Sequence, residues 1–195
     1  KIISRLSLGG YTYFILVREK HAFVTDIALG VLSLDLSDPK VPKVRNLFKT
    51  PGNAFDLTLY ENKALVSDGA NGLIVLDVKN PWKPKLIGKL SPKPVFRSVT
   101  FYRSFLYALG GSGGIYVYKL IKKMPKLIKH LDTPGLASRI SFSDSLAFVA
   151  DVLGGIQVLN VRKPQDLKIM HTFDLEEHPW GIHVKNKKAY IANAH

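Results

Sequence analysis

Apolar and polar residues alternate along this chain in short runs that recur about every 42 residues, the spacing typical of repeated β-sheet modules. One run follows a glycine in each copy: GVLSLDLSDP, GLIVLDVKNP, GIYVYKLIKK and GIQVLNVRKP begin at Gly30, Gly72, Gly114 and Gly155. A shorter apolar run precedes each glycine, and a fifth copy of it ends the chain; these runs end at Asp26, Asp68, Gly110, Asp151 and Asn193. The period of two within each run indicates strands, whereas helical repeats would show a period of about 3.6.

One unit, residues 53–91, contains four such runs: NAFDLTLYEN, KALVSD, GLIVLDVKNP and KPKLIGKLS. Clusters of Asn, Asp, Gly and Pro separate them, and such clusters form tight turns. Each unit is therefore predicted to be a four-stranded antiparallel sheet. A single sheet of this size cannot bury both of its faces, so neighbouring sheets must pack on one another.

Sheets of this kind packed face to face around an axis form a β-propeller, and we predict an all-β propeller with four full blades and a partial one. A repeat that continues almost from end to end favours a single domain over residues 1–195. The predicted parts are an outer strand within 1–10, blades at 11–51, 52–93, 94–134 and 135–177, and a partial blade at 178–195.

The innermost strands are predicted at 11–18, 53–60, 95–102, 136–143 and 179–185. The first residues then form an orphan outermost strand, which would complete the blade begun at Pro179. The ring would hold five blades in that case, and six or seven if the protein continues beyond this sequence. We expect both ends to be cut from a longer chain.

Turn residues recur at fixed positions, which indicates a structural role. The glycines that open the third strands are expected to adopt a positive φ, because the chain reverses there. Asp35 and Asp77 precede turns that a carboxylate can hold by accepting backbone amides. Because Lys119 and Asn160 replace them in the other units, a shared catalytic role is excluded.

The run GLIVLDVKNPWKPKLIGKL, with its weaker copies at Gly30 and Gly155, resembles the LVIVD repeat and is similar in strand order to YVTN-type surface-layer propellers. The TPG turns at Thr50 and Thr133 also match. The resemblance covers essentially the whole chain; the unit around residue 115 departs most, with Gly110 in place of the aspartate. It implies the architecture and a location in the cell envelope or outside the cell, with the cytoplasm left open, but no chemistry.

Composition narrows the function classes. The chain has 195 residues, 46% of them hydrophobic, and no apolar stretch long enough to span a bilayer. The absence of cysteine excludes disulfides, thiolate metal sites and a cysteine nucleophile. A net charge of +13 favours anionic partners, although lysines on outer strands also protect sheet edges.

Most chemical motifs are absent or incomplete. The GGSGG segment at 110–114 lacks the Gly-Lys-Ser/Thr ending of a phosphate loop and is interpreted as a turn. His178, His183 and Glu177 are candidate metal ligands, but no partner segment supplies the rest of a metal site. The basic run at 119–130 and the clusters at 83–93 and 185–188 lack the interleaved aromatics that stack nucleic-acid bases.

The strongest candidate site lies where the innermost strands start, at one mouth of the predicted channel. This position changes from unit to unit, as a ligand-reading position does in repeat proteins. Together with neighbouring residues it gives the candidate binding residues Tyr13, Phe55, Asp56, Arg97, Arg139 and Trp180. Packing between blades is the alternative role, above all for Tyr13 and Phe55.

We therefore expect a non-enzymatic scaffold, without a cofactor, that binds another protein or an anionic ligand through these residues. Two alternatives stay open: an enzyme or metal-binding propeller with its site in the channel, and a binder of anionic polymers through the basic surface. The oligomeric state is not predicted.

Overall fold

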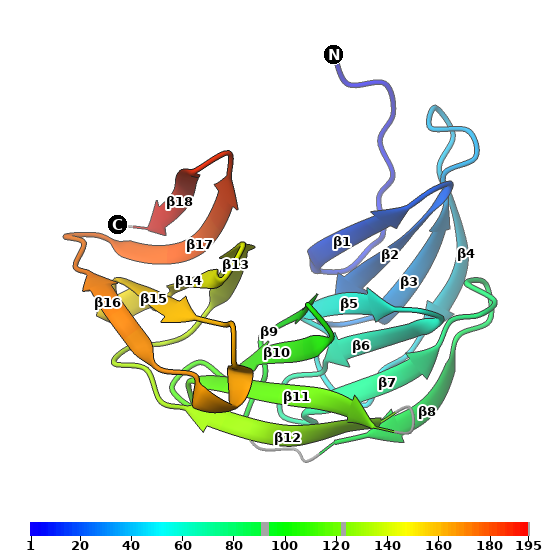
Figure 1. The fold of residues 1–195 in the computed structure, drawn as a ribbon. Helices are drawn as coiled ribbons and strands as arrows, with labels where there is room; N and C mark the ends of the chain where they lie inside the picture. Colours follow the sequence, from blue (N-terminus) through cyan, green and yellow to red (C-terminus); the bar gives the residue numbers. More distant parts are fainter. Residues whose placement is uncertain (91–93, 122–123, 195) are drawn as a thin grey trace. The chain divides into compact units, whose positions relative to one another are not determined.

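The computed structural model describes residues 1–90, 94–121 and 124–194, and within them the chain is almost entirely β-structure (Figure 1). Two short 3-10 helices, Val152–Gly154 and Pro164–Asp166, are the helical segments of these residues. Lys93, Lys122, Lys123 and His195, which belong to the predicted basic clusters and the last unit, lie outside the described residues. Contacts divide the chain into two compact units, residues 1–93 and 94–195, and each unit is described by itself.

The first unit holds two four-stranded antiparallel sheets with the strand orders β1-β2-β3-β4 and β5-β6-β7-β8. Sheet 1 comprises β1 Thr12–Arg18, β2 His21–Asp26, β3 Gly30–Asp35 and β4 Lys43–Phe48. Sheet 2 comprises β5 Asp56–Tyr60, β6 Lys63–Ser67, β7 Leu73–Asp77 and β8 Lys85–Lys89. Each sheet is an antiparallel meander, as the repeat predicts.

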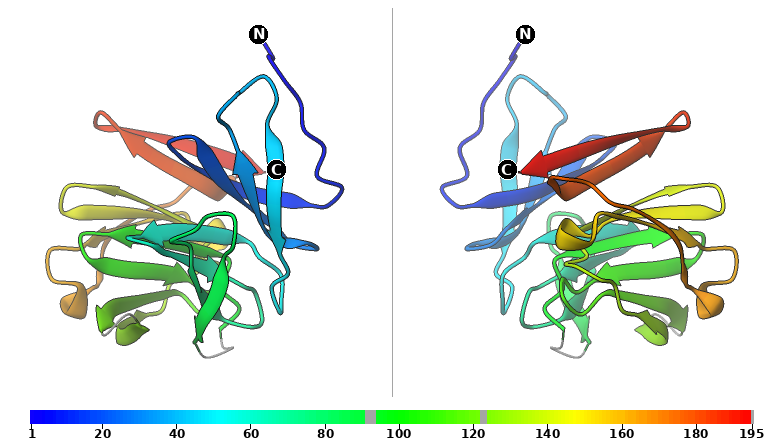
Figure 2. Two further views of the ribbon diagram at one scale, coloured as in Figure 1. Left: turned by 90° about the vertical axis from the view of Figure 1, so that its right-hand side faces the viewer. Right: turned by 90° about the vertical axis from the view of Figure 1, so that its left-hand side faces the viewer.

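The second unit holds two further four-stranded sheets and a hairpin. Sheet 3 comprises β9 Ser98–Tyr102, β10 Phe105–Leu109, β11 Ile115–Ile121 and β12 Met124–Leu131. Sheet 4 comprises β13 Arg139–Ser143, β14 Leu146–Ala150, β15 Ile156–Asn160 and β16 Ile169–Phe173, and the hairpin comprises β17 His178–Lys185 and β18 Lys188–Ala194. The hairpin packs on sheet 4 through β13 and β14 (Figure 2).

The expected four-stranded units and their innermost strands are confirmed. In sheets 2 to 4 the innermost strand starts about three residues later than predicted, because the residues before it form only single hydrogen bonds with the second strand. The backbone N–H groups of Phe55, Arg97 and Ser138 each donate to a second-strand carbonyl at 2.9–3.0 Å. The predicted single domain over 1–195 stays a prediction.

Apolar side chains on facing sheets form the core. In the first unit, Phe23 and Val31 of sheet 1 meet Leu57, Val66 and Ile74 of sheet 2 in one cluster. In the second unit, Tyr107, Val117, Ile140, Val149 and Leu159 cluster in the same way between sheets 3 and 4. In sheet 2 the second and third strands are buried along most of their length, whereas the fourth strand is mostly exposed. Facing sheets thus cover each other's apolar sides.

Every outer strand carries a β-bulge at the same place in the repeat, a feature that the sequence did not predict. The register shifts beside Ser33, Val75, Val117 and Val158, so one residue of each fourth strand lies opposite no partner. A bulge twists an edge strand and disrupts its row of unpaired backbone groups, which opposes edge-to-edge association. The charged lysines of these strands also oppose edge-to-edge association.

The structure assigns no strand to residues 2–8, and the prediction that they complete the sheet of β17 and β18 stays a prediction. The segment before Thr12 has no strand, and it runs as an unpaired coil in the views of Figure 2. An outermost strand pairs with the third strand of its sheet, and the sheet of β17 and β18 has no third strand among the described residues. The coil instead lies against sheet 1, where Ser4 Oγ donates to the Pro39 carbonyl at 2.8 Å and Leu8 packs on Val24 and Leu32.

The predicted turn roles are confirmed in detail. Gly30, Gly72, Gly114 and Gly155 have φ values of +105°, +79°, +70° and +73°. Asp35, Asp77 and Asn160 each accept the backbone N–H two residues on at 2.9–3.0 Å. Lys119 has no side-chain oxygen that could accept such a hydrogen bond. At this position β11 and β12 continue and form the longest hairpin of sheet 3.

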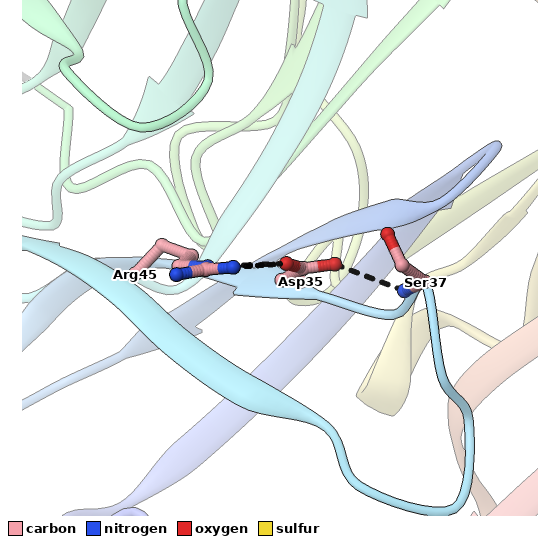
Figure 3. Close-up of polar contacts among 3 residues, drawn as sticks. All are labelled: Asp35, Ser37 and Arg45. Atoms are coloured by element: carbon pink, nitrogen blue, oxygen red, sulfur yellow. Dashed lines mark hydrogen bonds and ion pairs between the residues drawn. The ribbon is translucent and has the colours of Figure 1, made fainter.

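Asp35 has the strongest of these turn contacts (Figure 3). Its carboxylate accepts the Ser37 N–H at 2.9 Å and two Arg45 N–H groups at 2.7 and 3.1 Å. The Ser37 contacts, and then Arg45, hold the pKa of Asp35 well below its usual range.

We expect this carboxylate to stabilise the fold only where it is ionised. Because its folded pKa lies below its unfolded pKa, the contribution is present above the unfolded value of about 3.9 and is lost as the pH falls through the folded pKa. Asp35→Asn should therefore destabilise the chain more at pH 7 than at pH 2. Urea denaturation of both chains at the two pH values checks this, and an equal difference at both would contradict it.

Candidate ligand pocket at the start of the innermost strands

The variable repeat position lies at a local irregularity in every unit. Tyr13 and Trp180 are the extra residues of β-bulges at the start of β1 and β17. Phe55, Arg97 and Ser138 stand directly before their strands, outside the regular ladder. Bulges and strand starts redirect side chains away from the alternation of a strand, and they are common beside binding sites. This position therefore lies outside the regular ladder in all copies.

In the first unit two of the candidate residues, Tyr13 and Phe55, contact each other. The rings of Tyr13 and Phe55 meet edge to face with centroids 5.2 Å apart, and the Phe55 carbonyl accepts the Thr25 hydroxyl at 2.9 Å. Asp56 is only 2% exposed, and its carboxylate accepts the Leu57 N–H at 2.9 Å. This geometry fits packing between sheets 1 and 2 better than ligand binding.

In the second unit, Arg97 and Trp180 line the same pocket, of about 300 Å³. Its other lining residues are Val95, Gly110, Gly111, Ser112, Leu136, Ala137 and Ser138. Ser138 fixes one wall, because its hydroxyl lies 2.8 Å from the Trp180 carbonyl and 3.0 Å from that of Ala150. The three repeat-equivalent residues of this unit, Arg97, Ser138 and Trp180, therefore converge on one hollow.

Arg139 lies beside this pocket but not in its wall. Its guanidinium donates to the Ser98 hydroxyl at 3.2 Å and also borders a shallower hollow with His183 and Tyr190. The unit has a third hollow, between the turns at 143–146 and 187–189, which includes Lys187 and Lys188. Neither of these two hollows contains Arg97 or Trp180.

A side-chain clamp holds the turn before the innermost strand. Asp68 accepts the Gly52 N–H at 2.8 Å, and Asp151 accepts the Gly135 N–H at 2.9 Å and the Thr133 hydroxyl at 2.7 Å. Burial is the main cause that raises the pKa of both carboxyls, and these hydrogen bonds oppose it. The hairpin has a related pair, since Asn193 donates to Glu177 at 2.7 Å.

Sheet 3 replaces both partners of this clamp. Pro94 stands where Gly52 and Gly135 donate an N–H, and proline has none; Gly110 stands where Asp68 and Asp151 accept it. A Cβ on Gly110 would lie 2.5 Å from Pro94 Cγ, so the proline ring occupies the space of the missing side chain. The paired replacement removes a carboxylate from the pocket wall.

A comparison of sheets 2 and 3 shows why the pocket is open. A Cβ added to Gly69 of sheet 2 would lie 3.1 Å from the Phe55 ring, whereas a Cβ added to the equivalent Gly111 would meet nothing within 4 Å. Phe55 fills this space in sheet 2, and the arginine at the equivalent position of sheet 3 does not. The open space over Gly111 therefore distinguishes sheet 3 from sheet 2.

The metal candidates have other surroundings. Glu177 contacts Asn193, and His183 borders the hollow beside Arg139. Within residues 1–90, 94–121 and 124–194, no group of three or more His, Asp or Glu side chains is placed to hold a metal ion. The GGSGG segment forms the same hydrogen-bonded turn as Asp68–Gly72, which confirms its interpretation as a turn.

Sequence reasoning found Arg97 and Trp180 but missed Val95, Leu136 and the glycine turn as pocket walls. The available signal was the joint change to Pro94 and Gly110 in one unit. In the described part of the chain, no helix is long and apolar enough to cross a membrane.

Residues 51–91 match the profile of the LVIVD repeat, so the resemblance is confirmed for the unit that carries it most clearly. No curated protein matches the chain. Among solved structures, a functionally unknown protein from Desulfotomaculum acetoxidans is similar with a TM-score of 0.74 and 15% identity, over 97% of this chain and 65% of that one.

The computationally designed Ika8 protein is similar with a TM-score of 0.70 and 8% identity, over 94% of this chain and 55% of that one. PorZ, a bacterial surface component of the type-IX secretion system of Porphyromonas gingivalis, has a TM-score of 0.62 and 16% identity, over 93% of this chain and 23% of that one. These likenesses concern the fold. The chain spans about half to two thirds of the first two structures.

Proposed function

We propose that the repeats are blades of a β-propeller of five to seven blades, and that the chain serves as a non-enzymatic binding scaffold. The observation that carries the binding role is the pocket of the second unit, where variable repeat residues converge on one hollow while the invariant positions hold turns and core. Ligand pockets are concave, mostly apolar and lined by a few polar groups, as this one is.

The side chains of the pocket suit binding of a partner. Trp180 is 43% exposed although its backbone is held by Ser138, and Arg97 is also exposed on the same wall. Tryptophan and arginine are the residue types that most often dominate binding energy at protein interfaces. An exposed tryptophan and an exposed arginine that line one pocket therefore form a contact surface suited to a partner.

We further propose that the protein works in the cell envelope or outside the cell. The support is the LVIVD repeat itself, together with the fold likeness to PorZ, which is described as a bacterial surface component. Fractionation of source cells with an antibody to this chain would test the location, and a purely cytosolic signal would contradict it.

The binding role is tested with partners identified by mass spectrometry after capture on the immobilised chain. For the strongest identified partner, Arg97→Ala and Trp180→Ala should each weaken the affinity at least about 10-fold, since truncation of central Trp and Arg side chains often costs 2 kcal/mol or more. Isothermal titration calorimetry measures the change.

Arg162→Ala is the matched control, because it removes one exposed positive charge in the turn after β15, outside the pocket wall. Its affinity should equal that of the unaltered chain. An affinity that survives both pocket substitutions would remove the pocket from the function.

A further inference from the structure

We infer that the pocket at Arg97 and Trp180 binds a carboxylate carried beside an apolar side chain, the chemistry of a peptide C-terminus with an apolar last residue. This inference rests on the proposed binding function and specifies the ligand class of the same site.

The charge of the lining selects an anion. Arg97 is its charged residue, and no carboxylate side chain belongs to the wall. The repeat would place an aspartate at position 110, as it does at Asp68 and Asp151, but this sheet has glycine there. The substitution removes the negative charge that would oppose an anion beside Arg97.

The pocket lining contains one cation, Arg97, which matches a ligand group with a single negative charge. A guanidinium has five N–H donors arranged to hold both oxygens of a carboxylate, so Arg97 can bind one while keeping a protein contact. A phosphate group, with a charge near −2, needs more cations or a cradle of backbone amides. The wall supplies no second cation, and the N–H of Gly110 in its glycine turn already donates to the Gly114 carbonyl.

The remaining walls select an apolar neighbour. Val95, Leu136 and Ala137 present aliphatic surface, and the indole of Trp180 closes one side. A volume of about 300 Å³ lies at the small end of ligand pockets, so it accommodates one residue rather than a long segment. The open space over Gly111, which a phenylalanine ring fills in sheet 2, has the size and surroundings for an aromatic or branched side chain.

The probe pair is N-acetyl-L-phenylalanine and its amide, which differ in the carboxylate alone. We expect the acid to bind with a dissociation constant below about 1 mM and the amide to bind at least 10-fold more weakly, because the amide cannot form the charged pair. Chemical shifts of the Trp180 indole N–H, titrated in the complete 195-residue chain, report the binding.

Arg97→Phe copies the residue that sheet 2 accommodates at this position, so it should fold, fill the space over Gly111 and abolish binding of the acid. Arg97→Lys keeps the charge but loses the paired donors, and we expect a loss of about 5-fold. Arg162→Ala should bind as the unaltered chain does. Circular dichroism checks each fold, and Arg97→Gln replaces Arg97→Phe if the latter does not fold.

Peptides ending in Ala-Ala-Phe, with a free or an amidated terminus, then distinguish the source of the carboxylate. Tighter binding of the free peptide than of N-acetylphenylalanine assigns the site to chain ends, and equal affinity assigns it to small acids. The inference would be overturned if the acid and the amide bound equally, or if neither bound at about 10 mM. That concentration is about ten times the expected dissociation constant. Partner affinity that still depends on Trp180 would in that case leave the scaffold function intact.

Discussion

Asp151→Ala is expected to lower the free energy of unfolding by about 3 kcal/mol, the sum of modest losses from several buried groups left without a partner. The carboxylate accepts the Gly135 N–H, the Thr133 hydroxyl and, at 3.4 Å, the Gln157 amide, and Asp151 is fully buried. Alanine removes the acceptor of the partly buried Gly135 N–H and Thr133 hydroxyl, whereas the Gln157 amide keeps the Gly154 carbonyl. Urea denaturation monitored by circular dichroism measures the loss.

Asp151→Asn is the matched variant, and it should stay within about 1 kcal/mol of the unaltered chain at neutral pH. The asparagine oxygen can accept the Gly135 N–H while its amide donates to the Thr133 hydroxyl, which accepts as well as donates. A loss as large as that of alanine would show that the charge, and not the hydrogen bonds, holds the turn.

The pH dependence separates both variants from the unaltered chain, because neither carries the carboxyl that titrates. Burial raises the pKa of Asp151 in the folded chain, so the folded state binds the proton more tightly than the unfolded state does. The stabilisation linked to this proton is present below the unfolded pKa and is lost as the pH rises through the folded pKa. Asp151→Asn should therefore gain stability relative to the unaltered chain as the pH rises from about 3 to about 7. These two pH values lie on either side of the ordinary Asp pKa of about 4.

The architecture of the sheets could be predicted from the sequence because strand pairing repeats a local pattern. Alternation along the first strands predicts that Leu57 and Ile140 face the core, and both are buried; Ile15, at the same repeat position of sheet 1, is instead 52% exposed. Turn chemistry fixed the corners at Asp35, Asp77 and Asn160. Each of these inferences needs only neighbours along the chain.

The missed features depend on neighbours across the sheet or between sheets. The bulges opposite Ser33, Val75, Val117 and Val158 arise from the register of third and fourth strands, and no single strand encodes that register. The orphan strand at residues 2–8 was expected from the strand order of the repeat, but a strand needs a partner, and the segment has none among the described residues.

The candidate site was likewise predictable only in the part that depends on neighbours along the chain. Its position was predictable, because variation at a fixed repeat position needs only the sequence. The pocket itself depends on the contrast between Phe55 over Gly69 and the open space over Gly111, which is visible only when two sheets are compared in space. The structure therefore places Arg97 and Trp180 together while Tyr13 and Phe55 pack on each other.

Gly155→Ala is expected to destabilise the chain by about 4 kcal/mol, because two effects add. The backbone at Gly155 has φ 73° and ψ −143°, a region that residues with a Cβ rarely enter at a cost of about 1–3 kcal/mol. A Cβ would also collide with the carbonyl oxygen of Phe173, a backbone atom of the neighbouring strand β16. Relief of the collision requires β16 to separate from β15, where Phe173 pairs with Ile156.

Gly111→Ala is the matched control for this substitution. Gly111 also has a positive φ, +58°, but a Cβ there meets nothing within 4 Å. Its loss should be about 1 kcal/mol, the cost of the left-handed backbone alone. The difference between the two glycines, measured by urea denaturation, contains the steric part together with any extra cost of the Gly155 backbone conformation. Equal losses would mean that conformation, and not contact with the fourth strand, requires glycine where the third strand of each sheet begins.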